Sequence, residues 1–330
     1  KSCELDFNNP PPVAQMIVSV NDVPLGTQGN LLCITGGEGT GKSNYVAALI
    51  AGAVKPENAE GIDTLGVSIE GNPKGKAVLF YDTEQSEVQL YKNVSTLLRR
   101  CGRDTMPEWF KAYCLTGMSR KERLKSIVLS MDKFHYQYGG IHLVVIDGIA
   151  DLIRCANDEA ESIAVVEELY RLAGIYNTCI VTVLHFIPNG LKLRGHLGSE
   201  LQRKAAAILS IEKDTKPAVS VVKALKVRDG SPLDVPLMQF AWDKEKAMHA
   251  YLGEKPKEEK DRRKEEELVA VARELFSRKR FIGYMELSEE LQAAFEVKER
   301  TAKSYIRFMR EKEIIVKSPD SPNSYMLGEV

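Results

Sequence analysis

Short hydrophobic runs alternate along the first three quarters of the chain with stretches whose hydrophobic positions recur every three or four residues. Continuous apolar runs are typical of strands buried on both faces of a sheet, and the wider spacing is typical of amphipathic helices. This alternation predicts an α/β fold with a doubly wound, mostly parallel sheet. The predicted strands are 16–20, 30–35, 76–82, 109–115, 141–147 and 179–184, and the predicted helices are 43–54, 87–101, 120–134 and 159–175.

The pattern changes after the strand at 179–184. The segment 186–200 contains a proline, an asparagine and three glycines, and is predicted to be a loop. Two strand-like segments, 206–212 and 219–227, then follow each other without a helix between them. Because antiparallel strands can be joined by a short turn, they predict an antiparallel edge on the sheet, extended by a hairpin over 238–252.

Hydrophobic residues almost disappear between 253 and 264, which predicts a charged linker. Beyond it, three helical patterns and two short strands resemble a winged helix-turn-helix module. These helices are predicted to begin at 265 and to span 286–295 and 298–312, and the strands to span 314–317 and 325–327. We therefore divide the chain into an extension at 1–14, an α/β domain at 15–252, the linker at 253–264 and a small domain at 265–330.

The strongest motif is the octapeptide GGEGTGKS at 36–43, which fits G-x-x-x-x-G-K-[ST] and lies between a predicted strand and a predicted helix. Backbone N–H groups of such a loop surround a polyphosphate, Lys42 reaches the β- and γ-phosphates, and the Ser43 hydroxyl binds Mg²⁺. ATP and Mg²⁺ are therefore the expected ligands. The predicted ATP-binding residues are Gly36, Gly37, Glu38, Gly39, Thr40, Gly41, Lys42, Ser43 and Asn44.

Two acidic residues follow predicted strands. Asp147 ends the strand at 141–147, where it is expected to hold the Mg²⁺ shell together with Ser43. Glu84 lies just past the strand at 76–82 and could polarise the attacking water as a general base. The residue pattern leaves a second interpretation open, in which Glu84 only favours the N-terminus of the next helix.

Together, GGEGTGKS, VLFYDTEQS at 78–86 and LVVIDGIADL at 143–152 resemble the RecA-type ATPases, over roughly residues 15–250. The resemblance implies a RecA-like P-loop NTPase core in which Glu84 is the catalytic base. Within that superfamily the chain is more similar to hexameric helicases, namely the bacterial replicative helicase core and the plasmid RepA helicases.

Two further assignments follow from the helicase likeness. It implies that His185, after the strand at 179–184, senses the γ-phosphate; the alternative is a histidine that ends a buried strand. The segment KVRDG at 226–230 resembles their K-x-R-x-G element, which implies that Lys226 and Arg228 complete the ATP site of a neighbouring subunit. The alternative is a basic strand end on the surface. The expected assembly is a homo-oligomer, a hexamer by analogy.

DNA is the expected partner. By analogy, the segments 149–162 and 186–199 face the centre of the ring, where Lys192 and Arg194 could contact phosphates of a single strand. From 298 to 317 basic residues exceed acidic ones by four, which predicts duplex contacts through the third C-terminal helix. A surface loop and a protein-binding winged helix remain the respective alternatives. The residues predicted to contact duplex DNA are Arg300, Lys303, Ser304 and Arg307.

Composition restricts these interpretations only slightly. The net charge of −1 over 330 residues means that any nucleic-acid contact must come from local patches. Six scattered cysteines without metal-binding spacing indicate a reducing compartment. No apolar run approaches membrane-spanning length, so we expect a cytoplasmic protein without a membrane partner.

The sequence therefore predicts an ATP-hydrolysing, DNA-associated motor, a hexameric RepA-like helicase for replication or mobilisation of a plasmid or mobile element. One alternative is an ATP-switched DNA-binding regulator that does not unwind DNA. A P-loop small-molecule kinase is disfavoured by Glu84 and by the element at 226–230.

Overall fold

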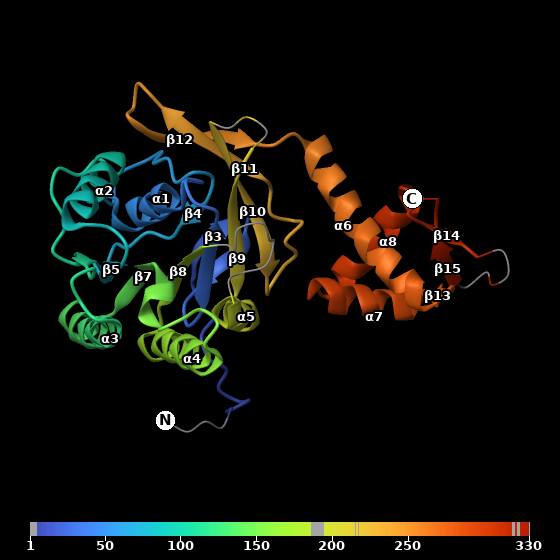
Figure 1. The fold of residues 1–330 in the computed structure, drawn as a ribbon, viewed down its shortest axis with the longest axis horizontal. Coiled ribbons are helices and arrows are strands. Elements are labelled where there is room, and N and C mark those ends of the chain that lie inside the picture. The colour runs from blue at the N-terminus through green and yellow to red at the C-terminus, as the bar shows by residue number, and fades with distance from the viewer. Residues whose placement is uncertain are drawn as a thin grey trace.

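The computed structural model describes residues 5–185, 195–214, 216, 218–318, 321 and 324–329 (Figure 1). The elements in chain order are β1 (Met16–Val20), β2 (Val23–Thr27), β3 (Leu31–Gly36), α1 (Lys42–Val54), β4 (Ser68–Ile69), β5 (Ala77–Asp82), α2 (Glu87–Arg100), β6 (Phe110–Cys114), α3 (Arg120–Gln137), β7 (Ile141–Asp147), the 3₁₀ turn η1 (Ile149–Leu152), α4 (Glu159–Tyr176), β8 (Cys179–His185), α5 (Gly195–Lys204), β9 (Ala207–Lys213), β10 (Val219–Val227), β11 (Met238–Asp243), β12 (Met248–Glu254), α6 (Lys257–Arg278), β13 (Ile282–Gly283), α7 (Tyr284–Phe295), α8 (Glu299–Glu311), β14 (Ile315–Lys317) and β15 (Ser324–Leu327).

The main sheet has nine strands in the order β12-β11-β10-β9-β3-β8-β7-β5-β6. The six strands from β9 to β6 pair in parallel, and β10, β11 and β12 add antiparallel strands at one edge. Crossing between parallel strands requires a helix, which explains the alternation of strands and helices in the sequence. The predicted α/β class, a RecA-like core with an antiparallel edge, is confirmed.

Helices cover both faces of this sheet (Figure 1). Buried side chains of α1 and α2 share one hydrophobic core with one face of the parallel strands, and those of α3, α4 and α5 share a second core with the other face. Strands β3, β5 and β7 are buried along their whole length, as their uninterrupted hydrophobic runs predict. Among the described residues, no helix combines the length and hydropathy needed to cross a bilayer.

The predicted strand at 16–20 is β1, but it belongs to a separate three-stranded sheet, ordered β2-β1-β4. Strand β2 was not predicted from the sequence. The two residues between β1 and β2, Asn21 and Asp22, have positive φ values of 48° and 63°. This is the geometry of a two-residue hairpin turn. Asn and Asp tolerate this conformation better than other residues with side chains, so the turn was readable from the sequence.

Two element boundaries differ from the predictions. Helix α6 begins at Lys257, inside the stretch predicted to be a linker, because pairs four residues apart such as Arg263–Glu267, at 2.8 Å, stabilise a helix without apolar residues. Helix α5 occupies the second part of the predicted loop 186–200, because Leu197 and Leu201 are buried in the core beside α4.

The C-terminal elements form a module of their own, with a hydrophobic core made by α6, α7, α8 and strands β13 to β15. The helices come in the order α6, α7, α8, and the small antiparallel sheet has the strand order β13-β15-β14. On α8 the predicted core stripe is buried, with Ala302, Tyr305, Ile306 and Met309 all at most 1% exposed. Leu233, from the segment after β10, also joins this core, so the module is anchored to the α/β domain.

Candidate functional site

The predicted phosphate loop and three of the predicted side chains meet at one edge of the sheet. Strand β3 ends at Gly36, β7 at Asp147 and β8 at His185, and the register pairs Gly36 with His185 and Asp82 with Asp147. Carboxyl ends of parallel strands are the usual place for a ligand in an open α/β sheet. The structure therefore brings together residues that are up to about 150 positions apart in the chain.

The phosphate loop is held closed by side chains of its own residues, which donate hydrogen bonds to its backbone carbonyls. A Cβ atom at Gly36 would lie 2.3 Å from the carbonyl oxygen of Ile211 on β9, so only glycine fits there. The Thr40 hydroxyl donates to the Gly37 carbonyl at 2.9 Å. Lys42, at the start of α1, is only 6% exposed, and its ammonium donates to the carbonyls of Gly36 at 3.0 Å and Gly37 at 2.6 Å.

Electrostatics at Lys42 fit a phosphate ligand. Burial lowers the pKa of Lys42, while the nearby charges of Asp147 and Glu84 raise it. An ammonium group kept out of water gains more from an added anion than an exposed one does, because the local dielectric is low. Of the remaining loop residues, Glu38, Gly39 and Asn44 are exposed and Ser43 is half-buried.

Asp147 is placed to hold a cation. It is 2% exposed, and burial, together with the charges of Asp82 and Glu84, raises its pKa to about 7, although the Ser43 hydroxyl opposes the shift. One carboxylate oxygen of Asp147 and one of Asp82 are buried without a hydrogen-bond partner among the described residues. A divalent cation would stabilise the ionised form of the Asp147 carboxylate, so this residue fits Mg²⁺.

The described residues contain no cluster of three or more His, Cys, Asp or Glu side chains suited to a metal on its own. That is compatible with Mg²⁺, which in nucleotide sites is usually held by one or two protein ligands, substrate phosphates and water. Ser43 and Asp147 are the two side chains that would hold it. The ion would neutralise charge that develops on the phosphoryl group.

Glu84 and His185 form a pair across the site. The Nε2 atom of His185 lies 3.2 Å from each carboxylate oxygen of Glu84. This hydrogen bond is the main reason why the pKa of Glu84 is lowered, and the charges of His185 and Lys42 add to it. Glu84 is therefore an ionised carboxylate at neutral pH, which a general base requires.

The segment that carries Glu84 is fixed by residues that the sequence analysis did not select. A carboxylate oxygen of Asp82 accepts hydrogen bonds from the backbone N–H groups of Glu84 at 3.0 Å and Gln85 at 2.8 Å. The Thr83 hydroxyl donates to the carbonyl of Asp147 at 3.0 Å and to that of Gly148 at 2.9 Å. The strand end that holds Asp147 and the turn that holds Glu84 are thus tied together.

Only glycine leaves room at position 148 for the hydrogen bonds of Thr83. Gly148 has φ of 95°, and a Cβ atom there would lie 2.2 Å from the Thr83 hydroxyl and 2.9 Å from the Cγ of Glu84. An Asp side chain often accepts hydrogen bonds from backbone N–H groups two and three residues later in a turn. This pattern is local, so the role of Asp82 could have been predicted from the sequence. The partners of Thr83 could not, because they lie on another strand.

Lys226 and Arg228 are not part of this cluster. In the sheet, Val227 pairs with Ala207, which pairs in turn with Leu32 near the start of β3, so both residues lie at the edge opposite the phosphate loop. The Lys226 ammonium donates to the carbonyl of Gln202 at 2.5 Å. Arg228 is exposed and donates to the carbonyls of Arg203 and Lys204, the last residues of α5.

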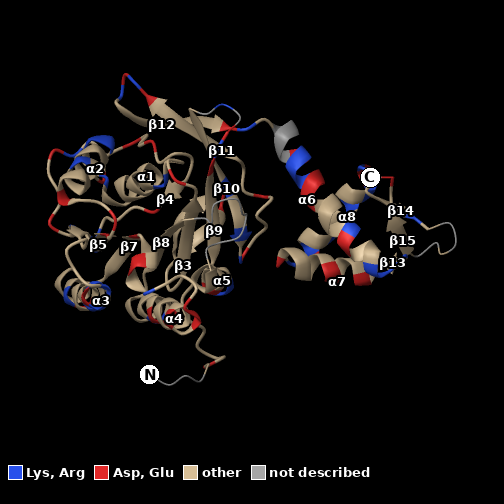
Figure 2. Cartoon of the chain, in the orientation of Figure 1, with Lys and Arg blue, Asp and Glu red and all other residues tan. Residues whose placement is uncertain are grey.

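The residues predicted to bind DNA lie elsewhere. Lys192 and Arg194 fall outside the described residues. On α8 the predicted basic face is partly neutralised within the helix, because Lys303 pairs with Glu299 at 2.7 Å and Arg307 with Glu311 at 2.8 Å. Basic and acidic positions are interspersed along the described parts of the module's helices (Figure 2). Arg300 and Ser304 are exposed on the same helix.

Comparison with known proteins agrees with the nucleotide site. No curated protein matches the chain. The family described as AAA domain matches residues 5–189, which is more than half of the chain and includes the phosphate loop, Glu84, Asp147 and His185. With this match and the geometry above, the chain belongs to the AAA domain family and is an ATP-driven P-loop NTPase.

Proposed function

We propose that this ATPase is a ring-forming DNA motor, a hexameric helicase of the RepA kind, in which each ATP is hydrolysed between two subunits. Within one chain, the loop at 36–44, Ser43 and Asp147 bind the nucleotide and Mg²⁺. Glu84 takes a proton from the attacking water, and His185 links that carboxylate to the γ-phosphate. The neighbouring chain supplies Lys226 and Arg228.

The observation that carries this proposal is the separation of the two sets of residues. The phosphate loop ends β3 at one edge of the sheet, and Lys226 and Arg228 lie near the level of Leu32, at the start of the same strand. At about 3.3 Å per residue, the four positions between Leu32 and Gly36 already span roughly 13 Å. Arg228 therefore lies well away from the loop that binds phosphate in its own chain.

An arginine that reaches the transferred phosphoryl group from a neighbouring molecule stabilises charge in the transition state, and typically accelerates hydrolysis about 10³- to 10⁵-fold. We therefore expect Arg228→Ala to bind a fluorescent ATP analogue like the wild-type chain and to lose ATP turnover by about that factor. Turnover is measured as phosphate release at saturating MgATP. Wild-type turnover in this variant would overturn the proposed role.

A mixing experiment tests whether the arginine acts between chains. Glu84→Gln chains lack the base but keep Arg228, and Arg228→Ala chains keep the base. If each site uses residues of two chains, mixing the two inactive variants restores part of the activity, because some junctions pair an intact Glu84 with an intact Arg228. If all residues act within one chain, the mixture stays inactive. The exposed Arg171→Ala on α4 is a matched control, since its guanidinium pairs only with Glu168 of the same helix among the interactions described.

A DNA role is supported by the C-terminal module. Its helices, followed by a hairpin, and its sheet order β13-β15-β14 agree with a winged helix-turn-helix domain at 265–330. Arg273, Arg278 and Arg280 line a hollow with Met326 and Leu327 of β15, which adds basic side chains beside the hairpin. Duplex binding by the full chain should weaken steeply as salt rises, because each phosphate contact releases counterions.

A second candidate function is an ATP-switched DNA-binding regulator. It is favoured by the ion pairs within α8, which partly neutralise the basic residues predicted to contact DNA. Such a protein needs only modest DNA affinity per subunit and no strand separation. A forked DNA substrate distinguishes the two functions. ATP-dependent release of the labelled strand supports the helicase, whereas ATP-dependent binding without release supports the regulator.

A further inference from the structure

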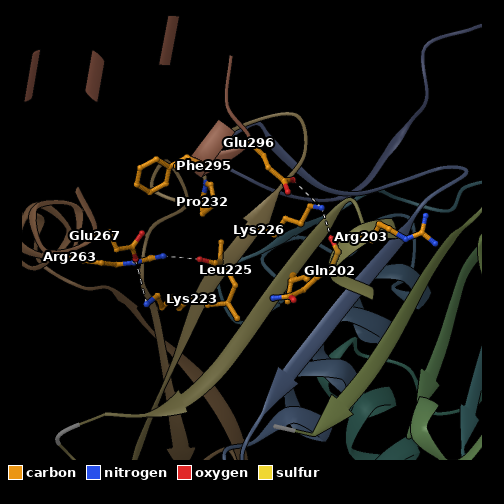
Figure 3. A pocket seen from close by; sticks show the side chains of 13 residues that line it. Gln202, Arg203, Lys223, Leu225, Lys226, Pro232, Arg263, Glu267, Phe295 and Glu296 are labelled. Carbon is orange, nitrogen blue, oxygen red and sulfur yellow. Dashed lines mark hydrogen bonds and ion pairs between the residues drawn. The ribbon is translucent and has the colours of Figure 1, made fainter. Parts of the chain in front are cut away.

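The C-terminal module touches the α/β domain at the strand that carries Lys226. A cavity of about 570 Å³ lies between the two parts (Figure 3). On one side it is lined by β10 and the end of α5, and on the other by α6 and the end of α7, including Arg263, Phe295 and Glu296. The two parts therefore meet around a hollow and do not share a continuous packed surface there.

The contacts at the rim of this cavity are mostly polar. The Lys226 ammonium lies 3.1 Å from a carboxylate oxygen of Glu296, the residue that follows α7 and caps it. Arg263 of α6 donates to the backbone carbonyl of Ala224 at 2.8 Å, and Lys223 lies 3.6 Å from Glu267. Glu296 points from the module toward Lys226 on β10 (Figure 3).

We propose that this contact is an autoinhibitory latch, in which the module of each chain holds Lys226, one of the two residues that would otherwise complete the neighbour's ATP site. The inference rests on the proposed function, because it needs Lys226 to act on a neighbouring nucleotide. The ammonium of Lys226 cannot pair with Glu296 and reach a neighbour's phosphate at the same time. The triphosphate bound by the neighbour therefore competes with Glu296, and its binding opens the latch.

The strength of the contact is suited to such competition. The Glu296 side chain is 63% exposed and that of Lys226 is 14% exposed, so water screens one partner. Ion pairs with an exposed partner change an equilibrium by only about 1.4- to 5-fold. A triphosphate with its several charges can displace a carboxylate held this weakly, whereas a fully buried pair would resist it.

Glu296 can be changed with little risk to the fold. It has φ of 51° at the end of α7, a conformation that Asn adopts more readily than Glu. Glu296→Asn thus removes the carboxylate and keeps the helix end, and Glu296→Lys places a second positive charge opposite Lys226. Glu289→Lys, at an exposed position on the same helix, changes the net charge of the module equally and is the matched control.

The test measures ATP turnover per subunit across a range of protein concentrations, with Arg228→Ala included. We expect both Glu296 variants to raise turnover about 2- to 5-fold at concentrations where the wild-type chain is not fully active, with Glu296→Lys having the larger effect. Glu289→Lys should match the wild type. A second measurement is hydrogen exchange of the backbone amides at 231–235 and 294–298. In the wild type, exchange should become faster when a non-hydrolysable ATP analogue is added. In the Glu296 variants, exchange should be equally fast without the analogue.

The outcomes separate the two proposals. If Arg228→Ala is inactive but the Glu296 variants match the wild type in turnover and in exchange, the latch is overturned. The proposal of a shared ATP site then still stands. Full turnover in Arg228→Ala would overturn the shared site and the latch with it. Unchanged melting temperatures of the Glu296 variants exclude unfolding of the module as the cause of any change.

Discussion

The two edges of the main sheet differ in how firmly their functional residues are held. At the carboxyl edge, the side chains of Lys42, Asp82 and Asp147 are at most 6% exposed. At the opposite edge, Arg228 is exposed and donates only to carbonyl groups at the end of α5. The phosphate-binding residues are built into the core of one chain, whereas Arg228, which we propose acts on a neighbouring chain, lies on its surface.

This difference follows from what each set of residues has to do. Groups that bind phosphate and its metal ion gain from burial, because charges act more strongly at low dielectric and need no rearrangement. Groups that serve another chain must stay accessible until that chain arrives. Under the proposed function such a group can also be regulated by whatever contacts it, and the C-terminal module contacts Lys226 through Glu296.

The largest effect at the buried edge is expected for Glu84→Gln. General-base catalysis contributes about 10²- to 10⁴-fold, so turnover should fall by that factor while the affinity for MgATP stays near the wild-type value. Phosphate release and nucleotide titration are the measurements. Glu87→Gln, an acid in the first turn of α2, is the control and should keep full turnover. A Glu84→Gln variant that hydrolyses ATP at the normal rate would remove Glu84 from the mechanism.

An intermediate effect is expected for Asp82→Ala. Without the acceptor for the N–H groups of Glu84 and Gln85, the base loses its fixed position, and a shift of about 1 Å can cost roughly 10²-fold in rate. Asp82→Asn keeps an oxygen in place and should retain most of the turnover. Both variants should bind MgATP, so the loss appears in kcat. Equal turnover of the Ala and Asn variants would show that the hydrogen bonds of Asp82 do not position the base.

The smallest effect is a shift in pH dependence for His185→Ala. His185 lowers the pKa of Glu84, and the base acts only when ionised. Removing His185 therefore raises the pKa of Glu84, and the acidic limb of the kcat profile moves to higher pH. In the folded wild type, this depressed pKa stabilises the protein above the pKa of Glu84 in the unfolded chain, and the contribution is lost as pH falls through the folded-state value.

The acidic limb is measured at saturating MgATP, with His196→Ala as the control because His196 is exposed on α5. A profile that does not move in His185→Ala would mean that the limb reports a group other than Glu84.

The sequence alone was sufficient to predict groups whose arrangement depends on residues close to each other in the chain. The phosphate loop is one continuous segment whose glycines, lysine and serine act through positions fixed by local backbone geometry. Asp147 and Glu84 were predicted because each follows a buried strand, and the carboxyl ends of parallel strands lie at one edge. The hydrophobic pattern likewise determined the α/β class and the antiparallel edge, since burial on both faces requires uninterrupted apolar runs.

Only the tertiary structure decided which distant residues meet. The Thr83 hydroxyl reaches carbonyl groups on β7, the end of α7 brings Glu296 to Lys226 across 70 positions of sequence, and α5 forms where a loop was expected because the core buries Leu197 and Leu201. Such contacts leave no periodic signal, because the sequence separation between partners depends on the packing of whole elements. Local sequence motifs thus determined which residues bind ATP. The fold determined which distant residues position them and which surfaces the C-terminal module contacts.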